Sequence, residues 1–205
     1  MPLLYVAPDP APNPRRVRIF LAEKGIEVPM KSLSIVAGEH KAAEFVDRYT
    51  PGQVPVLELD DGRMIGESVA ICRYFEALDP NPPLFGTDPV SIAEIDMWVR
   101  RVEWTLMTTV GQVWMHVHPF TARVVVPQYT EYGESNRPKA QAAMKRFDAA
   151  LRDRPFLAGD SYSMADIILL TTLDFAAFVG IARPEDVPAL ADWHERVSSR
   201  PSATA

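Results

Sequence analysis

The segment from which the fold can be inferred is Gln53-Val54-Pro55-Val56-Leu57-Glu58-Leu59-Asp60-Asp61-Gly62, followed by Glu67-Ser68. The apolar residues after Pro55 predict a short strand, and Asp61-Gly62 is a strong signal for a hairpin turn. Proline cannot donate a hydrogen bond to a strand ladder, so Pro55 belongs at the head of its strand. Glu67 and Ser68 stand at the start of a helix. The segment therefore predicts a strand, a hairpin and a helix start in succession.

This arrangement is suited to binding a small peptide. If the Val54–Pro55 bond is cis, the N–H and C=O groups of Val54 turn outward and can pair with an extended ligand. Ser68 offers its hydroxyl and backbone N–H to a carboxylate in the positive field of a helix start. Glu67 can bind an ammonium group beside it. Such a clamp fits the γ-glutamylcysteinyl part of glutathione, and the alternative is an ordinary hairpin followed by a capped helix.

Length and composition narrow the class of protein. The 205 residues can form one large domain or two small ones. A net charge of -6 argues against nucleic acid as a partner. No apolar run approaches the roughly 20 residues that span a bilayer, and the N-terminus lacks the features of a signal peptide, so we expect a cytoplasmic protein with no membrane partner. Cys72 is the single cysteine, which excludes an internal disulfide and requires a bound thiol for any thiol chemistry.

Residues 1–79 predict a mixed sheet covered by helices. Asn13 followed by Pro14 is a favoured N-cap and first-turn pair, and Gly25 ends the helix that they begin. The alternating prolines up to Pro14 exclude an earlier helix. The remaining expected elements are strands at 3–6 and 27–34, a helix at 40–48, strands beginning at 54 and 63, and a helix at 67–78.

The rest of the chain predicts helices only. Residues 80–88 form a proline-rich linker of the kind that separates domains, and the second domain extends over 89–205. Ser163-Met164-Ala165-Asp166 is a capping box that opens an almost wholly apolar helix at 167–178, which we expect to be buried. The other expected helices are at 89–117, 137–152 and 188–197.

Taken together, these segments resemble the cytosolic glutathione transferases (GSTs), in particular bacterial members and the theta and nu classes. The likeness covers essentially the whole chain. The segments that match are residues 11–25, Val54-Pro55, Glu67-Ser68, 156–160 and 163–166. The resemblance implies an α/β plus all-α architecture: a thioredoxin-like N-terminal domain with a mixed four-stranded sheet, then an all-helical GST C-terminal domain. It also implies a homodimer.

The resemblance implies roles for several residues in binding glutathione as a co-substrate, with no metal. Val54, preceding Pro55, pairs with the cysteinyl backbone, and Glu67 and Ser68 hold the γ-glutamyl end. The residues implied near the glycyl carboxylate are Gln53, Lys41 and His40. For Lys41 and His40 the alternative is a solvated surface position.

The position that holds the glutathione sulfur departs from much of the family. Relatives often carry a serine or cysteine at the place of Ala11, or a tyrosine at the end of the first strand. Bacterial relatives with a Thr-Pro-Asn sequence resemble Ala11-Pro12-Asn13, and in them the asparagine amide approaches the sulfur. Asn13 is therefore the candidate catalytic residue, and plain N-capping is its alternative role. Tyr5 is the second candidate, although a strand aromatic favours a core position; Arg16 either adds positive potential or is a solvated surface residue.

The predicted helix at 89–117 offers a stripe of aromatic and methionine residues for the second substrate. The candidate pocket residues are Trp104, Met107, Trp114, Met115 and His118, with Phe120 just beyond. Packing within the helical bundle is the alternative for each of them. His116 and His118 have no neighbouring acidic or cysteine partner in the sequence, so they do not indicate a metal site. Cys72 is expected to be a buried, inert thiol.

The sequence thus predicts a detoxifying glutathione transferase that stabilises the glutathione thiolate for attack on a small hydrophobic electrophile. One alternative is a glutathione-dependent disulfide reductase or peroxidase. A second is a non-catalytic GST-fold binding module, which the missing hydroxyl at Ala11 favours. Maleylacetoacetate isomerase fits less well, because the Ser-Ser-Cys run of that class is replaced by Ala11-Pro12-Asn13.

Overall fold

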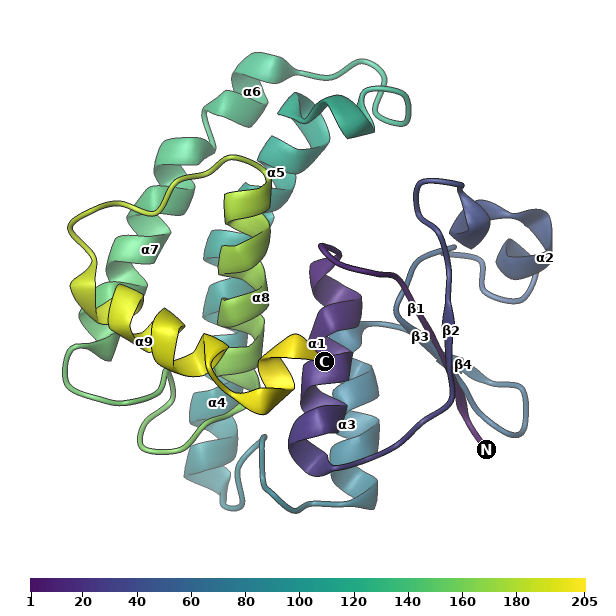
Figure 1. Cartoon of the computed structure of the whole chain (residues 1–205), viewed down its shortest axis with the longest axis horizontal. Helices are drawn as coiled ribbons and strands as arrows, with labels where there is room; N and C mark the ends of the chain where they lie inside the picture. The colour runs from purple at the N-terminus through teal and green to yellow at the C-terminus, as the bar shows by residue number, and fades with distance from the viewer. The chain divides into compact units, whose positions relative to one another are not determined.

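The computed structural model describes all residues from 1 to 205, and the chain divides into two compact units (Figure 1). Unit 1 comprises residues 1–84 together with 201–205, and unit 2 comprises residues 85–200. The border between residues 84 and 85 falls inside the predicted linker at 80–88. Each unit has its own set of buried apolar residues.

Unit 1 is built on a four-stranded mixed sheet. The strand order is β2-β1-β3-β4, with β1 parallel to β2 and antiparallel to β3. This order of strands and helices confirms the predicted thioredoxin-like architecture. In chain order the elements are β1 Leu3–Val6, α1 Pro12–Lys24, β2 Met30–Ser32, the short turn η1 Glu39–Lys41, α2 Ala43–Val46, β3 Val56–Glu58, β4 Met64–Ile65 and α3 Ser68–Leu78.

The strand expected to begin at residue 54 is the shorter β3, which begins at Val56, and two further elements of unit 1 are also shorter than the sequence predicts. The strand expected at 27–34 is limited to β2, which lies at the edge of the sheet with all three residues exposed. Pro29 immediately before it lacks the N–H that would extend the ladder. The helix expected at 40–48 is divided into η1 and α2, because Ala42 between them has an extended backbone with ψ of 140°.

The two faces of the sheet bury different side chains, because neighbouring residues of a strand alternate. Tyr5 of β1 and its partner Val56 of β3 form an apolar cluster with Leu33 and with Phe45 of α2. We call these four residues the Tyr5 cluster. Leu4 is fully buried on the opposite face, which α1 and α3 cover (Figure 1). Helix α2 and the Tyr5 cluster therefore lie on the face that does not contact α1.

Helix α1 begins two residues earlier than the sequence predicts. Pro12 is its first residue and Ala11 is its N-cap, so the expectation that Asn13 caps the helix is wrong. Pro12 has a fixed φ close to the helical value, and its missing N–H costs nothing at the first helical position. Asn13 is instead the second residue of the helix. The helix ends as predicted, at Gly25, whose φ of 64° is left-handed.

One buried lysine fastens the segment after α3 to the end of α1. The Nζ atom of Lys24 donates to the carbonyl oxygens of Asp79 and Pro82 at 2.7 and 2.8 Å. It also pairs with the carboxylate of Glu76 at 2.7 Å, and its side chain is fully buried. Three oxygen partners replace the water that the ammonium loses on burial. The beginning of the predicted linker is therefore held against unit 1.

Unit 2 contains helices and turns and no β-strand, which confirms the all-helical prediction. The expected helix at 89–117 is continuous, but its middle is the π-helical segment η2. There the hydroxyl of Thr108 donates to the carbonyl oxygen of Glu103 at 2.9 Å, and the same oxygen also accepts the backbone N–H of Thr108. The elements are α4 Pro89–Val102, η2 Glu103–Met107, α5 Thr108–Val117, η3 Pro119–Thr121, α6 Thr130–Glu134, α7 Arg137–Leu151, α8 Met164–Phe178 and α9 Pro188–Ser198.

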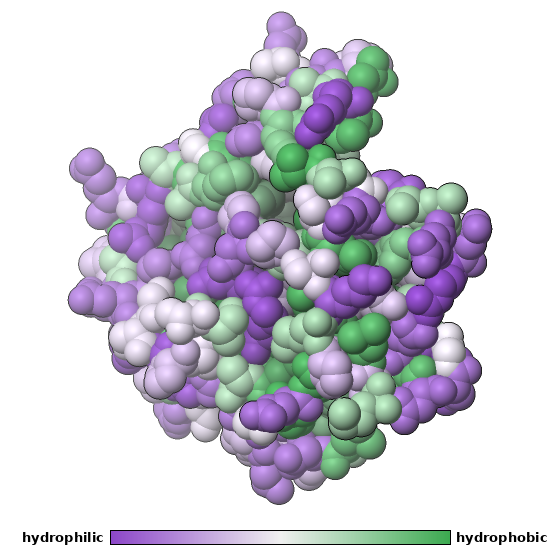
Figure 2. Space-filling model, turned by 45° about the vertical axis from the view of Figure 1, so that its right-hand side comes forward, coloured by the Kyte–Doolittle hydropathy of each residue, from purple (hydrophilic) through white to green (hydrophobic).

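The chain lacks any helix that combines the length and the apolar character needed to cross a bilayer. On the face drawn in Figure 2, hydrophobic residues occur among hydrophilic ones and do not form one continuous apolar surface. Large exposed hydrophobic side chains are scattered along the chain, and Trp104 and Val126 are among the most exposed, at 72% and 81%. Single exposed apolar residues of this kind are normal at protein surfaces.

The capping box predicted at the start of α8 is confirmed and extends into the core of unit 2. The carboxylate of Asp166 accepts hydrogen bonds from both the N–H and the hydroxyl of Ser163, each at 3.0 Å. It also accepts from the N–H of Leu157 at 2.8 Å and from the indole N–H of Trp193 at 3.0 Å. Asp166 is fully buried, and burial raises the pKa of its carboxyl while these four donors oppose the rise. One side chain therefore joins α8, α9 and the loop before α8.

Replacing Asp166 with alanine should destabilise unit 2. The Asp166→Ala variant leaves buried donors without an acceptor, and we expect the free energy of unfolding to fall by about 3 kcal/mol. All four tryptophans lie between residues 98 and 193, so the midpoint of urea unfolding followed by tryptophan fluorescence reports on this unit. Asp160→Ala, at an exposed position of the same loop, is the matched control and should leave the midpoint unchanged. Equal midpoints for the two variants would contradict the role given to Asp166.

Candidate functional site

The backbone of Val54 has no hydrogen-bond partner in the protein. The Val54–Pro55 bond is cis, as the predicted clamp requires. The ladder between β1 and β3 ends at the pair Tyr5 and Val56, so Val54 lies beyond it, and neither its N–H nor its C=O pairs elsewhere. Its side chain packs against the Tyr5 cluster. A fixed, half-buried residue with both main-chain groups unpaired can bind an extended peptide as a further strand would.

Glu67 and Ser68 form the turn that leads into α3. Glu67 has a φ of 62° and is the one residue other than glycine with positive φ in the chain. This conformation is unfavourable for a residue with a Cβ atom and is often found at ligand-binding positions. Ser68 is the first residue of α3, is only 5% exposed, and has no hydrogen-bond partner for its hydroxyl. No side chain caps this helix, so its first N–H groups remain available to an anion.

The three residues expected near the glycyl carboxylate lie on two adjacent segments. A Cβ atom on Gly52 would lie 2.9 Å from the carbonyl oxygen of His40 and 3.2 Å from Cδ of Lys41, so η1 packs directly against the loop that carries Gln53. The ammonium of Lys41 donates to the carbonyl oxygen of Pro51 at 3.0 Å. Both segments therefore come together immediately before the Val54 clamp.

His40 and Lys41 differ in what they can offer to a carboxylate. Partial burial and the neighbouring charge of Lys41 lower the pKa of His40, so its ring is neutral at neutral pH. Its Nδ1 atom is buried and has no partner. Lys41 is exposed and charged, so it is the residue of the pair that can supply positive charge to an anion.

Asn13 stands at the start of α1 as an isolated donor. Pro12 and Pro14 have no N–H group, and the N–H of Arg15 already donates to the carbonyl oxygen of Ala11. Asn13 therefore carries the single main-chain N–H among the first three residues of the helix, and its side-chain amide lies beside it. The Oδ1 atom of Asn13 is buried and has no partner within the protein. Since Asn13 does not cap the helix, its amide is not committed to a structural hydrogen bond.

Tyr5 occupies the core position that the sequence favours, and its hydroxyl is already used. It donates to the carboxylate of Glu58 at 2.9 Å and accepts from the guanidinium of Arg48 at 3.1 Å, while Arg48 pairs directly with Glu58. These hydrogen bonds, first that of Arg48 and then that of Tyr5, lower the pKa of Glu58. The Tyr5 ring is 4% exposed. Its hydroxyl is therefore a structural group rather than an available donor.

Arg16 and Cys72 are both buried in unit 1. Arg16 is 2% exposed, so its description as a solvated surface residue is wrong, and its charge acts on its surroundings at low dielectric. Cys72 is fully buried, and burial raises the pKa of its thiol far above the usual value. The expectation that Cys72 is an inert thiol is confirmed.

Tyr49 is a residue of this region that the sequence does not reveal. A Cβ atom on Gly66 would lie 1.8 Å from its hydroxyl oxygen, so the side chain rests on the backbone just before Glu67. The contact joins the side chain of Tyr49 to the backbone of Gly66, 17 residues further along the chain. No spacing or motif marks such a pair.

The candidate residues for the second substrate fall into different surroundings in unit 2. Trp114 and His118 belong to one aromatic cluster, with ring centroids 4.6 Å apart, and Phe120, Phe175 and Phe178 complete it. Met107 accepts a hydrogen bond on sulfur from Thr172 at 3.9 Å, a packing role. Trp104 and Met115 are exposed by 72% and 42% and lie outside the aromatic cluster.

The two histidines of this region make local hydrogen bonds. The Nδ1 atom of His118 accepts from the N–H of Phe120 at 3.2 Å, and that of His116 accepts from the N–H of Tyr129 at 3.3 Å. No group of three or more histidine, cysteine, aspartate or glutamate side chains is placed to hold a metal ion. The Nδ1 atoms of both rings are therefore already used in local hydrogen bonds near the end of α5.

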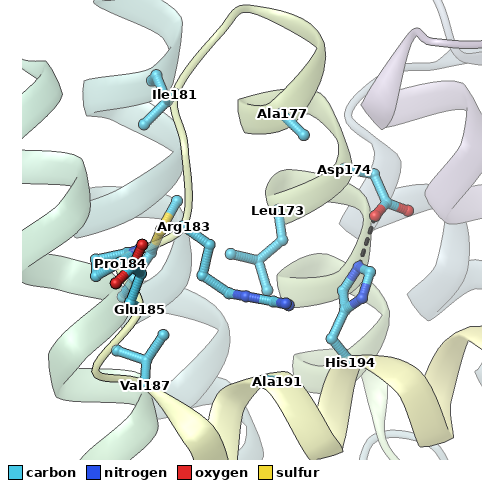
Figure 3. Close-up of a pocket in the computed structure, with 11 residues that line it drawn as sticks. Leu173, Asp174, Ala177, Ile181, Arg183, Pro184, Glu185, Val187, Ala191 and His194 are labelled. Carbon is cyan, nitrogen blue, oxygen red and sulfur yellow. Dashed lines mark hydrogen bonds and ion pairs between the residues drawn. The ribbon is translucent and has the colours of Figure 1, made fainter.

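Unit 2 also contains a cavity of about 490 Å³ lined by α7, α8, α9 and the loop before α9 (Figure 3). On one side His194 pairs with Asp174 at 2.7 Å. Arg183 extends from the loop into the cavity toward His194, and Glu185 lies on the same loop (Figure 3). The lining contains no serine, threonine, tyrosine or cysteine. It therefore offers no hydroxyl or thiol group to a ligand.

Comparison with known proteins identifies the family. Residues 11–78 match the N-terminal domain of glutathione S-transferase, and residues 113–201 match its C-terminal domain. Glutathione S-transferase 2 of Saccharomyces cerevisiae is 42% identical over 98% of this chain and 87% of its own length. Human glutathione S-transferase theta-2B is 30% identical over 90% of this chain and 76% of its own length, in keeping with the predicted theta-class similarity.

Solved structures agree with this assignment. The crystal structure of Gtt2 from Saccharomyces cerevisiae superimposes with a TM-score of 0.92 at 41% identity over 98% of both chains. A glutathione S-transferase domain-containing protein of Marinobacter aquaeolei gives a TM-score of 0.92 at 35% identity, again over 98% of both chains. The chain therefore belongs to the glutathione S-transferase family, and its fold and activity are those of a glutathione transferase.

The role of Tyr5 can be tested by removing its hydroxyl. We expect Tyr5→Phe to lower the free energy of unfolding by about 1 kcal/mol at neutral pH, because Glu58 and Arg48 lose a partner. The pKa of Glu58 should rise in the variant. A carboxyl group whose pKa is lowered in the folded protein stabilises the fold at pH values above its unfolded pKa, and this contribution is lost as the pH falls through the folded pKa. The difference in the free energy of unfolding between the wild type and Tyr5→Phe should therefore become smaller in acid. Thermal unfolding of both proteins at neutral and acidic pH measures the difference in stability. A large rise in the pKa of bound glutathione in Tyr5→Phe would contradict the structural role given to the Tyr5 hydroxyl.

Proposed function

We propose that unit 1 of this glutathione transferase binds glutathione as an extended peptide along Val54, with the γ-glutamyl end at Glu67 and Ser68. The observation that carries the proposal is that the two main-chain groups of Val54 and the hydroxyl of Ser68 are all unpaired. The ligand supplies their partners: a cysteinyl N–H and C=O for Val54, and a carboxylate for Ser68 and the start of α3. Glu67 binds the ammonium of the same γ-glutamyl group. Lys41 and Gln53, with His40 beside them, bind the glycyl carboxylate.

Asn13 holds the glutathione sulfur as a thiolate in this proposal. A free thiol has a pKa of about 8.5, and lowering it by about two units requires roughly 2.7 kcal/mol in favour of the thiolate. One hydrogen bond to a charged group supplies about 1.5–3 kcal/mol, and a helix start adds about 0.3–1 kcal/mol. The side-chain amide and the main-chain N–H of Asn13 provide both at one residue. The thiolate then attacks the electrophile directly, without a covalent enzyme intermediate.

The hydrophobic electrophile is bound by residues of unit 2 in this proposal. The ring faces of Trp114 and His118, with the three phenylalanines of their cluster, suit a planar or apolar molecule. Met107, Met115 and Trp104 were predicted for the same pocket, and their roles stay predictions. We further propose that the protein is a cytoplasmic homodimer acting in detoxification. Its bacterial origin and its similarity to the nu class likewise stay predictions.

Two measurements test this function directly. Isothermal titration calorimetry with millimolar glutathione should show binding by the purified protein. Turnover with a chloro-nitroaromatic should exceed turnover with a glutathione mixed disulfide, because the single cysteine of the chain, Cys72, is fully buried and cannot exchange with a disulfide. Faster reduction of the disulfide would favour the reductase alternative. Binding of glutathione without conjugation of any member of a broad electrophile panel would favour the non-catalytic module.

The role of Asn13 predicts a shift in the titration of bound glutathione. In Asn13→Ala, the pKa of the bound thiol should rise by about one to two units, which corresponds to the loss of one hydrogen bond to a charged group. The ultraviolet absorbance of the thiolate, followed against pH with saturating glutathione, measures this pKa. Tyr5→Phe is the matched control, and in this variant the pKa of the bound thiol should stay at its wild-type value. An unchanged titration in Asn13→Ala would remove Asn13 from the mechanism.

Lys41 should act on the glycyl carboxylate alone. We expect Lys41→Ala to raise the KM for glutathione about three- to tenfold, the loss of one partly exposed charged contact. With γ-glutamylcysteine, which lacks the glycyl carboxylate, the wild type and the variant should have the same KM. Lys139→Ala, an exposed lysine of unit 2, is the control for general loss of charge. An equal rise in KM with both peptides would show that Lys41 acts elsewhere.

A further inference from the structure

Tyr49 fills the space where a side chain at position 66 would stand. A Cβ atom built on Gly66 would lie 1.8 Å from the hydroxyl oxygen of Tyr49 and 2.8 Å from Cζ of its ring. Real Cβ atoms do not approach other atoms this closely, so the ring and a residue larger than glycine cannot both keep these positions. Gly66 does not have a positive φ, and its backbone conformation is therefore open to alanine. Contact with Tyr49 is the feature that requires glycine here.

The ring of Tyr49 is supported from behind. It packs edge-on against Phe45 with centroids 6.3 Å apart, and Phe45 packs in the same way against Tyr5 at 5.3 Å. Tyr49 thus rests on the Tyr5 cluster, which also supports Val54. Edge-to-face aromatic pairs have a defined geometry, so the ring has little freedom to retreat from Gly66.

The hydroxyl of Tyr49 lies in the electrostatic field of Glu67. Partial burial and the charge of Glu67 raise the pKa of Tyr49, so the phenol keeps its proton at neutral pH. It makes no hydrogen bond within the protein. The uncharged hydroxyl packs against the backbone at Gly66 and adds no second negative charge next to Glu67.

We infer that Tyr49 is a positioning residue for the γ-glutamyl end of glutathione: its ring and hydroxyl hold the Gly66–Glu67 backbone in place. The inference rests on the proposed function, which places that end of the ligand at Glu67 and Ser68. Glu67 has a positive φ of 62°, which a residue with a Cβ atom does not adopt without support, and the residue before it is the one that Tyr49 contacts. Holding this turn fixes the direction of the Glu67 carboxylate and of the first N–H groups of α3. Ordering these groups before the ligand arrives lowers the cost of binding.

Removal of the hydroxyl tests this role with little disturbance of the fold. In Tyr49→Phe, the Kd for glutathione should rise about three- to tenfold. The kcat at saturating glutathione and the pKa of the bound thiol should stay at their wild-type values, because the sulfur site at Asn13 is separate. A loss of affinity with unchanged kcat is not expected from general destabilisation. A Kd within twofold of wild type would overturn the inference.

The contact itself is tested by a double-mutant cycle on Tyr49 and Gly66. Gly66→Ala in the wild-type protein should raise the Kd for glutathione by tenfold or more, on the order of the coupling found for residues in direct contact. In the Tyr49→Phe background, Gly66→Ala should raise the Kd for glutathione by a several-fold smaller factor, because the atom nearest to the new Cβ is absent. Gly111→Ala is the control: Gly111 has no positive φ, and its Cβ would meet nothing within 4 Å. Equal effects of Gly66→Ala in the two backgrounds would overturn the inference.

Failure of the proposed function gives a different result. If the wild-type protein shows no heat with glutathione, both the proposed function and the inference fall. If the wild type binds and the Tyr49 and Gly66 substitutions act independently, the proposed function stands and the role of Tyr49 is rejected.

Discussion

Both ends of the proposed peptide site depend on one small apolar cluster between the sheet and α2. Tyr5, Val56, Leu33 and Phe45 form this cluster, and Val54 packs against it. Tyr49 rests on the same rings and carries the contact on to the turn before α3. Because a packed interior deforms little, the backbone clamp and the helix start are held at a fixed spacing. In the proposed function, the cluster therefore sets the distance over which the ligand extends.

The chemistry of the sulfur site follows from which polar groups the fold has already used. The hydroxyl of Tyr5 is bound between Glu58 and Arg48, so it cannot also hold a thiolate. The groups of Asn13, in contrast, are available: neither its side-chain amide nor its main-chain N–H is used in a hydrogen bond within the protein. The prolines on both sides of Asn13 remove competing donors and leave this residue as the positive end of α1. In the proposed function, an amide therefore serves a family position that often carries a hydroxyl or thiol group.

Unit 2 is organised by a polar centre as much as by apolar packing. Asp166 is buried among hydrophobic residues and accepts four hydrogen bonds, one of them from Trp193 of α9. A buried acceptor with several donors specifies one arrangement of the elements that it joins, because any other leaves unpaired groups in the interior. The aromatic cluster around Trp114 lies toward the end of α5, away from this centre in sequence. The unit therefore separates its structural support from the rings proposed to bind the electrophile.

The sequence by itself determined the features that depend on neighbours along the chain: the Asp61-Gly62 hairpin, the Ser163–Asp166 capping box, the end of α1 at Gly25 and the order of strands and helices. These follow from backbone preferences and from hydrogen bonds spanning three or four residues. The tertiary structure decided what depends on contacts between distant segments, such as Lys24 with the segment after α3 and Tyr49 with Gly66. Such contacts follow from how side chains fill shared space, which no local pattern encodes.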